Sequence, residues 1–145
     1  PLTTGQAPDF SLKDQHNDVV SLSELPSPII ISVFPNTNTS VCSVQTRRFN
    51  QEAAAHKEIA FLSISNNTPE EQANWCAAEG VEMTILSDAN NEFGKLYGIV
   101  MAEANLLARS VFVIKDGQII YTEILSEMTD EPNYDKALQV ADAAI

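Results

Sequence analysis

Residues 28–42 read PIIISVFPNTNTSVC, and this stretch decides the fold of the chain. Its first part, Pro28 to Phe34, is an apolar, β-branched run, which is the pattern of a central buried strand. The residues from Cys42 to Lys57 read as a helix, and Thr39 or Ser40 stands where a helix cap is expected. The stretch therefore predicts a buried strand that turns into a helix, with a cysteine at the helix start.

The segments on either side alternate between strand and helix patterns. Further strands are expected over Asn17–Leu22, Ile59–Ser65, Met83–Leu86, Ser110–Ile114 and Gln118–Leu125, and further helices over Pro69–Glu79, Asn91–Tyr97 and Tyr134–Ile145. Thr68 followed by a proline and two acids is a strong helix start, and Asp116-Gly117 between apolar runs predicts a hairpin. This order predicts an α/β fold with a central mixed β-sheet flanked by helices, in a single domain over residues 1–145.

The chain is strongly acidic, with 20 Asp and Glu residues against 8 Lys and Arg, and a formal net charge of −12. Phosphate backbones and anionic membrane surfaces would be repelled, so neither nucleic acid nor a membrane is expected as a partner. No apolar run is long enough to suggest a transmembrane span, and no basic-then-apolar leader follows Pro1. The simplest role of this acidity is solubility.

Cys42 is the residue whose position points most directly to chemistry. A thiol in the first turn of a helix faces unpaired backbone N–H groups and the positive end of the helix dipole. Both stabilise the thiolate, which is the nucleophilic form of cysteine. Cys42 is therefore expected to be a reactive thiol that takes part in redox chemistry, and the alternative is an inert buried cysteine at a helix start.

Cys76 is the second of only two cysteines in the chain. Two thiols in a domain of this size do not resemble the disulfide framework of a secreted protein. Their spacing excludes a Cys-x-x-Cys dithiol site, and no Cys and His residues have the spacing of zinc ligands, so no metal is expected. His16 and His56 stand alone in the sequence and are expected at the surface.

Several motifs occur in the order that is typical of one protein family. Pro35, Thr39 and Cys42 form the pattern Pro-x-x-x-Thr-x-x-Cys. Four more motifs follow: residues 47–51 read RRFNQ, 75–80 read WCAAEG, 108–114 read ARSVFVI and 127–134 read EMTDEPNY. Together they resemble the peroxiredoxins, and among these the branch of bacterial thiol peroxidases, which are atypical two-cysteine peroxiredoxins. The resemblance extends over almost the whole chain.

The resemblance implies a role for each residue of the expected site. Cys42 would be the peroxidatic cysteine, and Cys76 the resolving cysteine that condenses with its sulfenic acid to form an intramolecular disulfide. Thr39 would hydrogen-bond the thiolate and the peroxide, although it also fits as a plain helix cap. Pro35 would shield the thiolate from water, or simply end the strand. Arg109 would lower the pKa of the thiol and hold the departing oxygen, although its sequence position alone equally fits a surface arginine.

The resemblance also implies the wider properties of the protein. It implies a thioredoxin-like fold and a peroxidase that reduces hydrogen peroxide and alkyl or lipid hydroperoxides, with thioredoxin reopening the disulfide. No metal, haem or flavin cofactor is implied. The segment Ile99–Leu107 would border the substrate channel and a homodimer contact. A transient disulfide suits a reducing cytoplasm, so a cytoplasmic location is expected.

Several alternatives stay open at this point. A disulfide brings two Cα atoms within about 7 Å, so the segment around Cys42, the one around Cys76, or both are expected to unfold locally in each cycle. Arg47 or Arg48 would support the site or lie on a solvated helix face. The same two cysteines would also serve a peroxide sensor that passes oxidation to a partner protein. A non-catalytic binding module is the third hypothesis.

Overall fold

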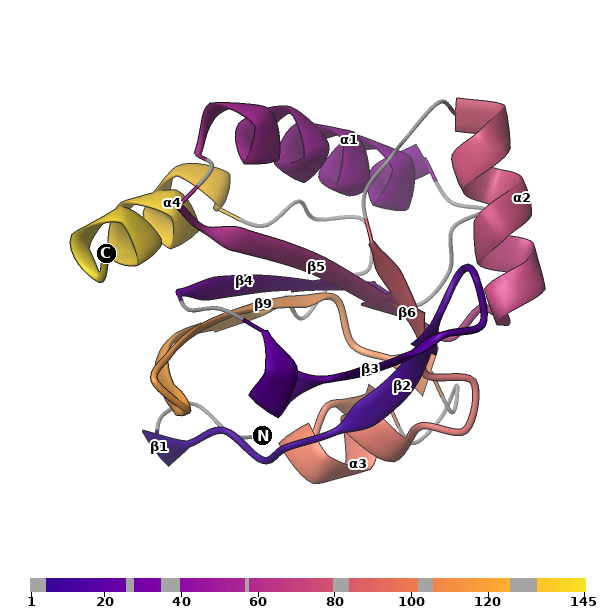
Figure 1. Cartoon of the computed structure of the whole chain (residues 1–145), viewed down its shortest axis with the longest axis horizontal. Coiled ribbons are helices and arrows are strands. Elements are labelled where there is room, and N and C mark those ends of the chain that lie inside the picture. Colours follow the sequence, from indigo (N-terminus) through magenta and orange to yellow (C-terminus); the bar gives the residue numbers. More distant parts are fainter. Residues whose placement is uncertain are drawn as a thin grey trace.

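In the computed structural model, an eight-stranded sheet runs through the centre of the protein (Figure 1). The structure describes residues 5–25, 28–34, 40–56, 58–79, 84–101, 106–125 and 133–145. The strands of this sheet are β1 (Gly5–Gln6), β2 (Ser11–Asp14), β3 (Val19–Ser21), β4 (Ile29–Val33), β5 (Ala60–Ser65), β6 (Ile85–Ser87), β9 (Ser110–Lys115) and β10 (Gln118–Ile124). They lie in the order β1-β10-β9-β4-β5-β6-β2-β3. A second, two-stranded sheet pairs β7 (Val100–Met101) with β8 (Leu106–Leu107).

The three central strands β4, β5 and β6 are parallel, and helices connect them. α1 (Ser40–Ala55) joins β4 to β5, and α2 (Pro69–Glu79) joins β5 to β6, because parallel neighbours need a crossover connection. On the other side of β4, strands β9 and β10 pair antiparallel. The remaining helices are the short 3-10 helix η1 (Leu22–Glu24), α3 (Glu92–Tyr97) and α4 (Tyr134–Ala143). The expected mixed sheet flanked by helices is confirmed.

Side chains of the central strands alternate between two buried layers, as the period of two in a strand requires. We call one layer the α1 face; it consists of Ile30, Phe49, Ile59, Trp75, Ile85, Val111, Val113, Tyr134, Ala137, Leu138 and Ala141. The other layer, the α3 face, includes Phe10, Leu12, Leu22, Ile29, Ile31, Val33, Leu62, Ile64, Leu86, Phe93, Tyr97, Phe112 and Ile114. Helices α1, α2 and α4 therefore contribute to one face and α3 to the other (Figure 1).

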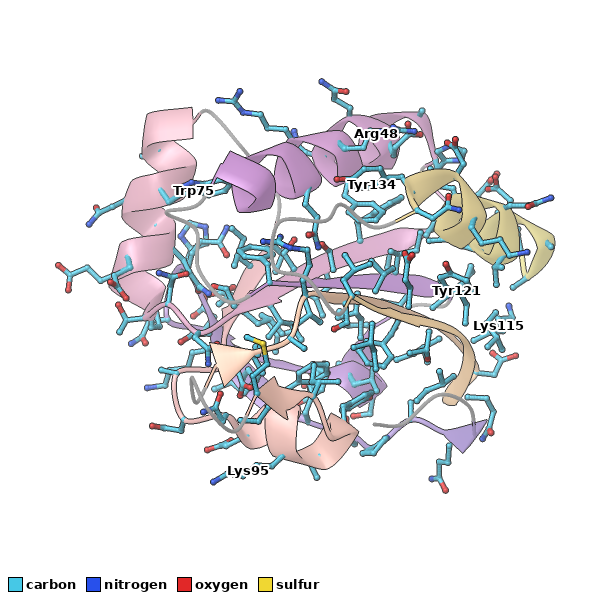
Figure 2. The ribbon with its side chains drawn as sticks, turned by 180° about the vertical axis from the view of Figure 1, so that it is seen from behind. Arg48, Trp75, Lys95, Lys115, Tyr121 and Tyr134 are labelled. Atoms are coloured by element: carbon cyan, nitrogen blue, oxygen red, sulfur yellow. The ribbon has the colours of Figure 1, made fainter. Side chains whose placement is uncertain are left out.

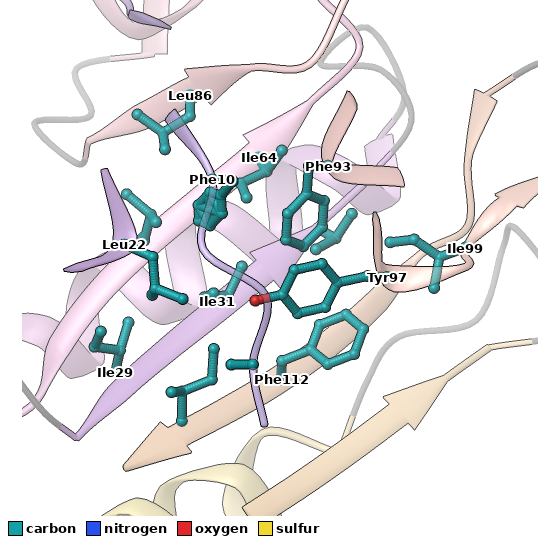
Figure 3. Packing of buried hydrophobic residues seen from close by; sticks show 14 of the residues in the cluster. Phe10, Leu22, Ile29, Ile31, Ile64, Leu86, Phe93, Tyr97, Ile99 and Phe112 are labelled. Carbon is teal, nitrogen blue, oxygen red and sulfur yellow. The ribbon is translucent and has the colours of Figure 1, made fainter. Parts of the chain in front are cut away.

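The α3 face is packed around a group of aromatic rings (Figure 3). Phe93 and Tyr97 of α3 stack with ring centroids 4.3 Å apart, and Tyr97 meets Phe112 of β9 edge-on at 5.2 Å. Phe10 meets Phe93 edge-on at 5.1 Å. The Tyr97 hydroxyl donates to the carbonyl of Pro8 at 2.8 Å, and burial raises the pKa of this phenol. The contacts join the segment before β2 to α3 and β9.

A buried carboxylate holds the start of α3. Asp88 accepts hydrogen bonds from the backbone N–H groups of Phe93 and Gly94, both at 2.9 Å, and burial nevertheless raises its pKa. Gly94 allows a close approach, because a Cβ there would lie 2.5 Å from Leu107 Cδ2 and 2.6 Å from Val100 Cγ2. Gly98 ends the helix in the left-handed conformation, which is common for a glycine at this position.

Some expected bounds of secondary structure are wrong in detail: the strand expected over Met83–Leu86, for example, is β6 at Ile85–Ser87. The strand expected over Asn17–Leu22 is shorter, because Asn17 lies in a turn with φ 68° and Leu22 begins η1. The carboxylate of Asp14 accepts the N–H groups of residues 16 and 18, and so stabilises that turn. The segment Ile99–Leu107 contains β7 and β8. Among the described residues, no helix has the length and apolarity needed to cross a membrane.

Candidate active site

The candidate site begins where β4 leads into α1. All five residues of β4 are buried, and α1 starts at Ser40, so the backbone of Cys42 lies in the first turn of the helix. The structure therefore confirms the expected position of this cysteine at a helix N-terminus. The side chain of Cys42 lies outside the described part of the chain, and so do Pro35 and Thr39. Their expected roles stay predictions.

The described centre of the site is a buried chain of three polar side chains. Arg109 donates from Nη1 to the Oε1 atom of Gln45 at 2.8 Å, and Gln45 donates from Nε2 to Ser32 Oγ at 2.6 Å. All three are essentially inaccessible, with exposed fractions of 1%, 0% and 0%. A buried guanidinium needs such partners, because an unsatisfied charge in the interior is costly. Arg109 is therefore an interior residue, and its alternative as a surface arginine is excluded.

The register of the sheet places Arg109 at the Cys42 end of β4. Ser110 of β9 pairs with Val33, the last residue of β4, so Arg109 precedes β9 at the edge where the chain turns towards α1. Asn66 fixes the segment that precedes Arg109, because its Oδ1 atom accepts a hydrogen bond from the backbone N–H of Leu107 at 2.7 Å. Its Nδ2 donates to Asn91 Oδ1 at 2.7 Å. The polar contacts at the ends of β5 and β6 thus position the segment that enters β9.

Cys76 lies in the later part of α2, and its side chain is also outside the described residues. The start of α2 is a capping box: Thr68 Oγ1 accepts the Glu71 N–H at 3.2 Å, and Glu71 Oε1 accepts the Thr68 N–H at 2.9 Å. Gln72, fully buried, donates to Ser65 Oγ at 2.9 Å and to the Leu86 carbonyl at 2.8 Å. Trp75 packs into the α1 face. The described anchors of α2 therefore all precede Cys76.

Arg48 on α1 and His56, which directly follows the end of α1, fasten this helix to α4. Arg48 donates to Glu52 and to Asp135, both at 3.0 Å, and lies 5.0 Å above the ring of Tyr134 (Figure 2). The hydrogen bond to Glu52 is the main cause that raises the pKa of Arg48. His56 lies 3.2 Å from a carboxylate oxygen of Glu52 and 3.2 Å from one of Asp142. Arg48 is thus a contact between helices, while Arg47 is exposed.

One hollow that described residues line lies away from the candidate site. A cavity of about 320 Å³ lies between Ala7, Leu22, Ile29 and Ile114. Ile29 is the first residue of β4, whereas Cys42 follows the last one. The hollow is therefore at the opposite end of the central strand.

Sequence reasoning missed Gln45, Ser32 and Asn66. The sequence does indicate that Gln45 is buried, because it precedes the core residue Phe49 by four positions and so shares its buried helix face. Ser32 likewise interrupts an otherwise apolar strand. A polar residue on a buried face needs a partner, and here the two are partners of each other.

Comparison with known proteins identifies the family. The model of the AhpC/TSA family matches residues 3–122. This chain belongs to the AhpC/TSA family. The thiol peroxidase of Listeria monocytogenes is 45% identical over 143 residues, which cover 96% of this chain and 87% of that protein. The thiol peroxidase of Bacillus subtilis is 42% identical over 144 residues, covering 97% and 86% of the two chains. The resemblance to bacterial thiol peroxidases is confirmed.

Solved structures of two similar proteins share the fold. A peroxiredoxin-like protein from Aquifex aeolicus superimposes with a TM-score of 0.89 at 25% identity, over 100% of this chain and 88% of the other. The peroxidoxin BcpB from Mycobacterium tuberculosis gives a TM-score of 0.88 at 25% identity, over 100% and 99% of the two chains. The thioredoxin-like fold is thereby confirmed, and so is the expected enzyme class, a peroxidase of the peroxiredoxin type.

Proposed function

We propose that the protein reduces hydrogen peroxide and alkyl or lipid hydroperoxides through Cys42 and Cys76, with thioredoxin as the reductant. The Cys42 thiolate attacks one peroxide oxygen, the O–O bond breaks, and the other oxygen leaves as an alkoxide or hydroxide that takes up a proton. The thiol of Cys76 then attacks the Cys42 sulfenic acid, giving a disulfide and water. Two thiol–disulfide exchanges with the thioredoxin dithiol restore both thiols.

The main observation behind this proposal is that Arg109 is buried. Its guanidinium donates to Gln45, which lies on the α1 turn that follows Cys42. A cation in the interior stabilises a neighbouring thiolate and the negative charge that develops on the departing oxygen. Its position at the end of β4 also agrees with the proposed roles of Pro35 and Thr39, which connect β4 to α1. The identity of 40–45% to curated thiol peroxidases supports the same assignment.

We expect the disulfide step to involve movement, because both cysteines lie in helices and a disulfide brings two Cα atoms within about 7 Å. The described anchors of α2 lie on the N-terminal side of Cys76, and Gln45, the first described anchor of α1, lies after Cys42. Unwinding the first turn of α1 or the last turns of α2 would leave these anchors in place, and helix ends open at little cost. We infer that the cysteines meet by local unfolding of these two helix ends.

Intact mass after one equivalent of hydroperoxide tests the cycle. Fully reduced protein is expected to lose about 2 Da, which is the signature of an intramolecular disulfide without added oxygen. A gain of about 16 Da would mean that Cys76 does not resolve the sulfenic acid, as in a sensor or a one-cysteine enzyme. An unchanged mass would overturn the peroxidase mechanism.

The reductant and the assembly need their own measurements. Thioredoxin with its reductase is expected to support continuous turnover, which NADPH consumption follows; a failure with active thioredoxin would point to another dithiol donor. A homodimer and a cytoplasmic location are proposed from the family resemblance. Light scattering on the eluting protein tests the dimer, and a monomer mass at working concentration would contradict it.

A further inference from the structure

Gln72 is a fully buried amide of α2 whose oxygen lacks a described donor. Its Nε2 atom donates to Ser65 Oγ at 2.9 Å and to the Leu86 carbonyl at 2.8 Å. Because a carbonyl oxygen only accepts, the amide nitrogen must face Leu86, and the orientation of the amide is fixed. The Oε1 atom accepts no hydrogen bond from the described residues. A buried acceptor without a donor is costly, so a donor is expected among the groups that the structure does not describe.

The geometry of α2 places position 76 beside this oxygen. Cys76 follows Gln72 by four positions in a continuous helix, so the two positions share one face and lie one turn apart. Side chains of a helix lean towards its N-terminus, so a side chain at position 76 covers the turn that contains Gln72. The exposed residues Glu70, Asn74 and Ala77 lie on the other side of the helix. Position 76 therefore belongs to the face that contains the free amide oxygen.

A thiol is a donor that fits this place, because it is small, uncharged and able to donate through S–H. Such a bond stabilises the thiol and has no counterpart in the thiolate, and the negative end of the amide dipole opposes a thiolate beside it. Burial acts in the same direction. Since the thiolate is the form that attacks a peroxide, a cysteine held in this way reacts slowly.

We propose that the Gln72 amide oxygen accepts a hydrogen bond from the Cys76 thiol and keeps this cysteine in its thiol form while α2 is folded. This inference rests on the proposed peroxidase function, in which Gln72 is a positioning residue. It sets the order of the two cysteines, because Cys42 meets the peroxide as a thiolate while Cys76 stays protonated. When the end of α2 unwinds, the bond breaks. The Cys76 thiol then gives up its proton and attacks the Cys42 sulfenic acid, and the products are the disulfide and water.

The test uses the Cys42→Ser protein, in which Cys76 is the only thiol. The infrared S–H stretching band reports the hydrogen bond, because a donating thiol absorbs at lower frequency. The ultraviolet absorbance of the thiolate, followed against pH, gives the pKa of the thiol. Gln72→Leu removes the acceptor, so the band is expected to move to higher frequency and the thiol to titrate at lower pH. Direct oxidation of Cys76 by hydroperoxide should become about 5-fold faster, as the loss of one ordinary hydrogen bond implies.

Ser65→Ala is the matched control, because it removes another anchor of the same amide and leaves Oε1 in place. The Nε2 atom of Gln72 still donates to the Leu86 carbonyl in this variant. Ser65→Ala is therefore expected to speed amide exchange in α2 and to leave the S–H band and the titration unchanged. The same changes in both variants would mean that a looser α2 controls the thiol, which would overturn the proposal.

Two further outcomes decide the matter. An S–H band that Gln72→Leu leaves unchanged would mean that water or a backbone carbonyl is the partner, and the proposal would be wrong. If Gln72→Leu does not fold, the Cys42→Ser protein is compared with its own urea-unfolded form. The folded protein should then show the lower S–H frequency, and a higher one, typical of a thiol without an acceptor, would overturn the proposal.

Failure of this inference differs from failure of the proposed function. If the reduced protein with both cysteines keeps its mass after hydroperoxide, the peroxidase function is wrong. If it loses about 2 Da and the S–H band of Cys76 does not depend on Gln72, the function stands and the role of Gln72 is wrong.

Discussion

The two faces of the central sheet are buried by different kinds of side chain. The α3 face is aliphatic and aromatic around Phe93, Tyr97 and Phe112. The α1 face has a comparable apolar layer, but its strand ends carry fully buried polar groups that bind Gln45 and Gln72. Apolar packing is tolerant of small changes, whereas a buried polar network demands defined partners. The difference indicates that one face mainly stabilises the fold while the other also positions chemistry.

The largest expected effect separates chemistry from stability on the α1 face. Cys42→Ser is expected to lower peroxidase turnover by a factor on the order of 10⁴ or more, because a serine hydroxyl does not ionise and cannot replace the thiolate. Steady-state turnover and thermal unfolding measure the two properties. Cys76→Ser is the control, because it should keep the first oxidation and lose only the disulfide. Substantial turnover of Cys42→Ser would refute the assignment of the nucleophile.

The α3 face is tested by removing an aromatic ring. Phe93 is fully buried, so Phe93→Ala should reduce the free energy of unfolding by about 3–5 kcal/mol. Folded molecules should still oxidise Cys42 at the parent rate. Urea unfolding gives the first quantity and single-turnover oxidation the second. Phe93→Leu is the milder control, and a selective loss of oxidation rate in either variant would contradict the division of roles between the faces.

The Asp88 carboxylate at the start of α3 predicts a pH dependence. Burial raises its folded pKa above the ordinary value of 3.8, so the folded protein holds this proton more tightly than the unfolded chain. The resulting stability is fully present below the ordinary pKa and is lost as the pH rises through the raised one. The difference in unfolding free energy between the parent and Asp88→Asn should therefore fall with rising pH. Its slope cannot exceed about 1.4 kcal/mol per pH unit.

Urea unfolding of both proteins between pH 4 and pH 7 would measure this difference. A parent that gains stability over Asp88→Asn as the pH rises would mean that the two backbone N–H donors outweigh burial. The sign of the slope thus decides which of these two influences on Asp88 is larger.

The smallest expected effect concerns the start of α2. Thr68→Ala removes an N-cap acceptor and should cost about 1 kcal/mol, while Thr68→Ser keeps the hydroxyl and should cost less. Amide exchange should become faster in the first turn of α2 and stay unchanged in α1. The rate of the first oxidation at Cys42 should not change. Faster exchange in both helices would show that they open as one unit.

Strands and helices could be predicted where local chemistry determines them. The apolar run before Pro35, the proline and acids after Thr68, and the Asp116-Gly117 turn each dictate a backbone path. Asp116 and Gly117 have φ values of 51° and 78°, as a tight hairpin requires. The same local rules placed Cys42 in the first turn of α1.

Contacts between distant segments could not be predicted in this way. Nothing local in Ala108-Arg109-Ser110 says that the arginine is buried, since its partner Gln45 comes from another element. The family resemblance selected Arg109 as a site residue, but it did not indicate Gln45, because no quoted motif includes that position. The network around Asn66 was missed for the same reason: it joins the ends of two strands and the start of α3.

The antiparallel register of β4 and β9 has a consequence for how this protein tolerates insertions. Val33 lies opposite Ser110 because the pairing that starts with Ile29 and Ile114 continues to this point without a shift in register. The distance between Cys42 and Arg109 therefore depends on strand pairing, and the length of chain between them has little influence on it. Residues could be added to the connection between α2 and β6 without moving the guanidinium, whereas one residue inserted within β9 is expected to turn Arg109 towards the opposite face.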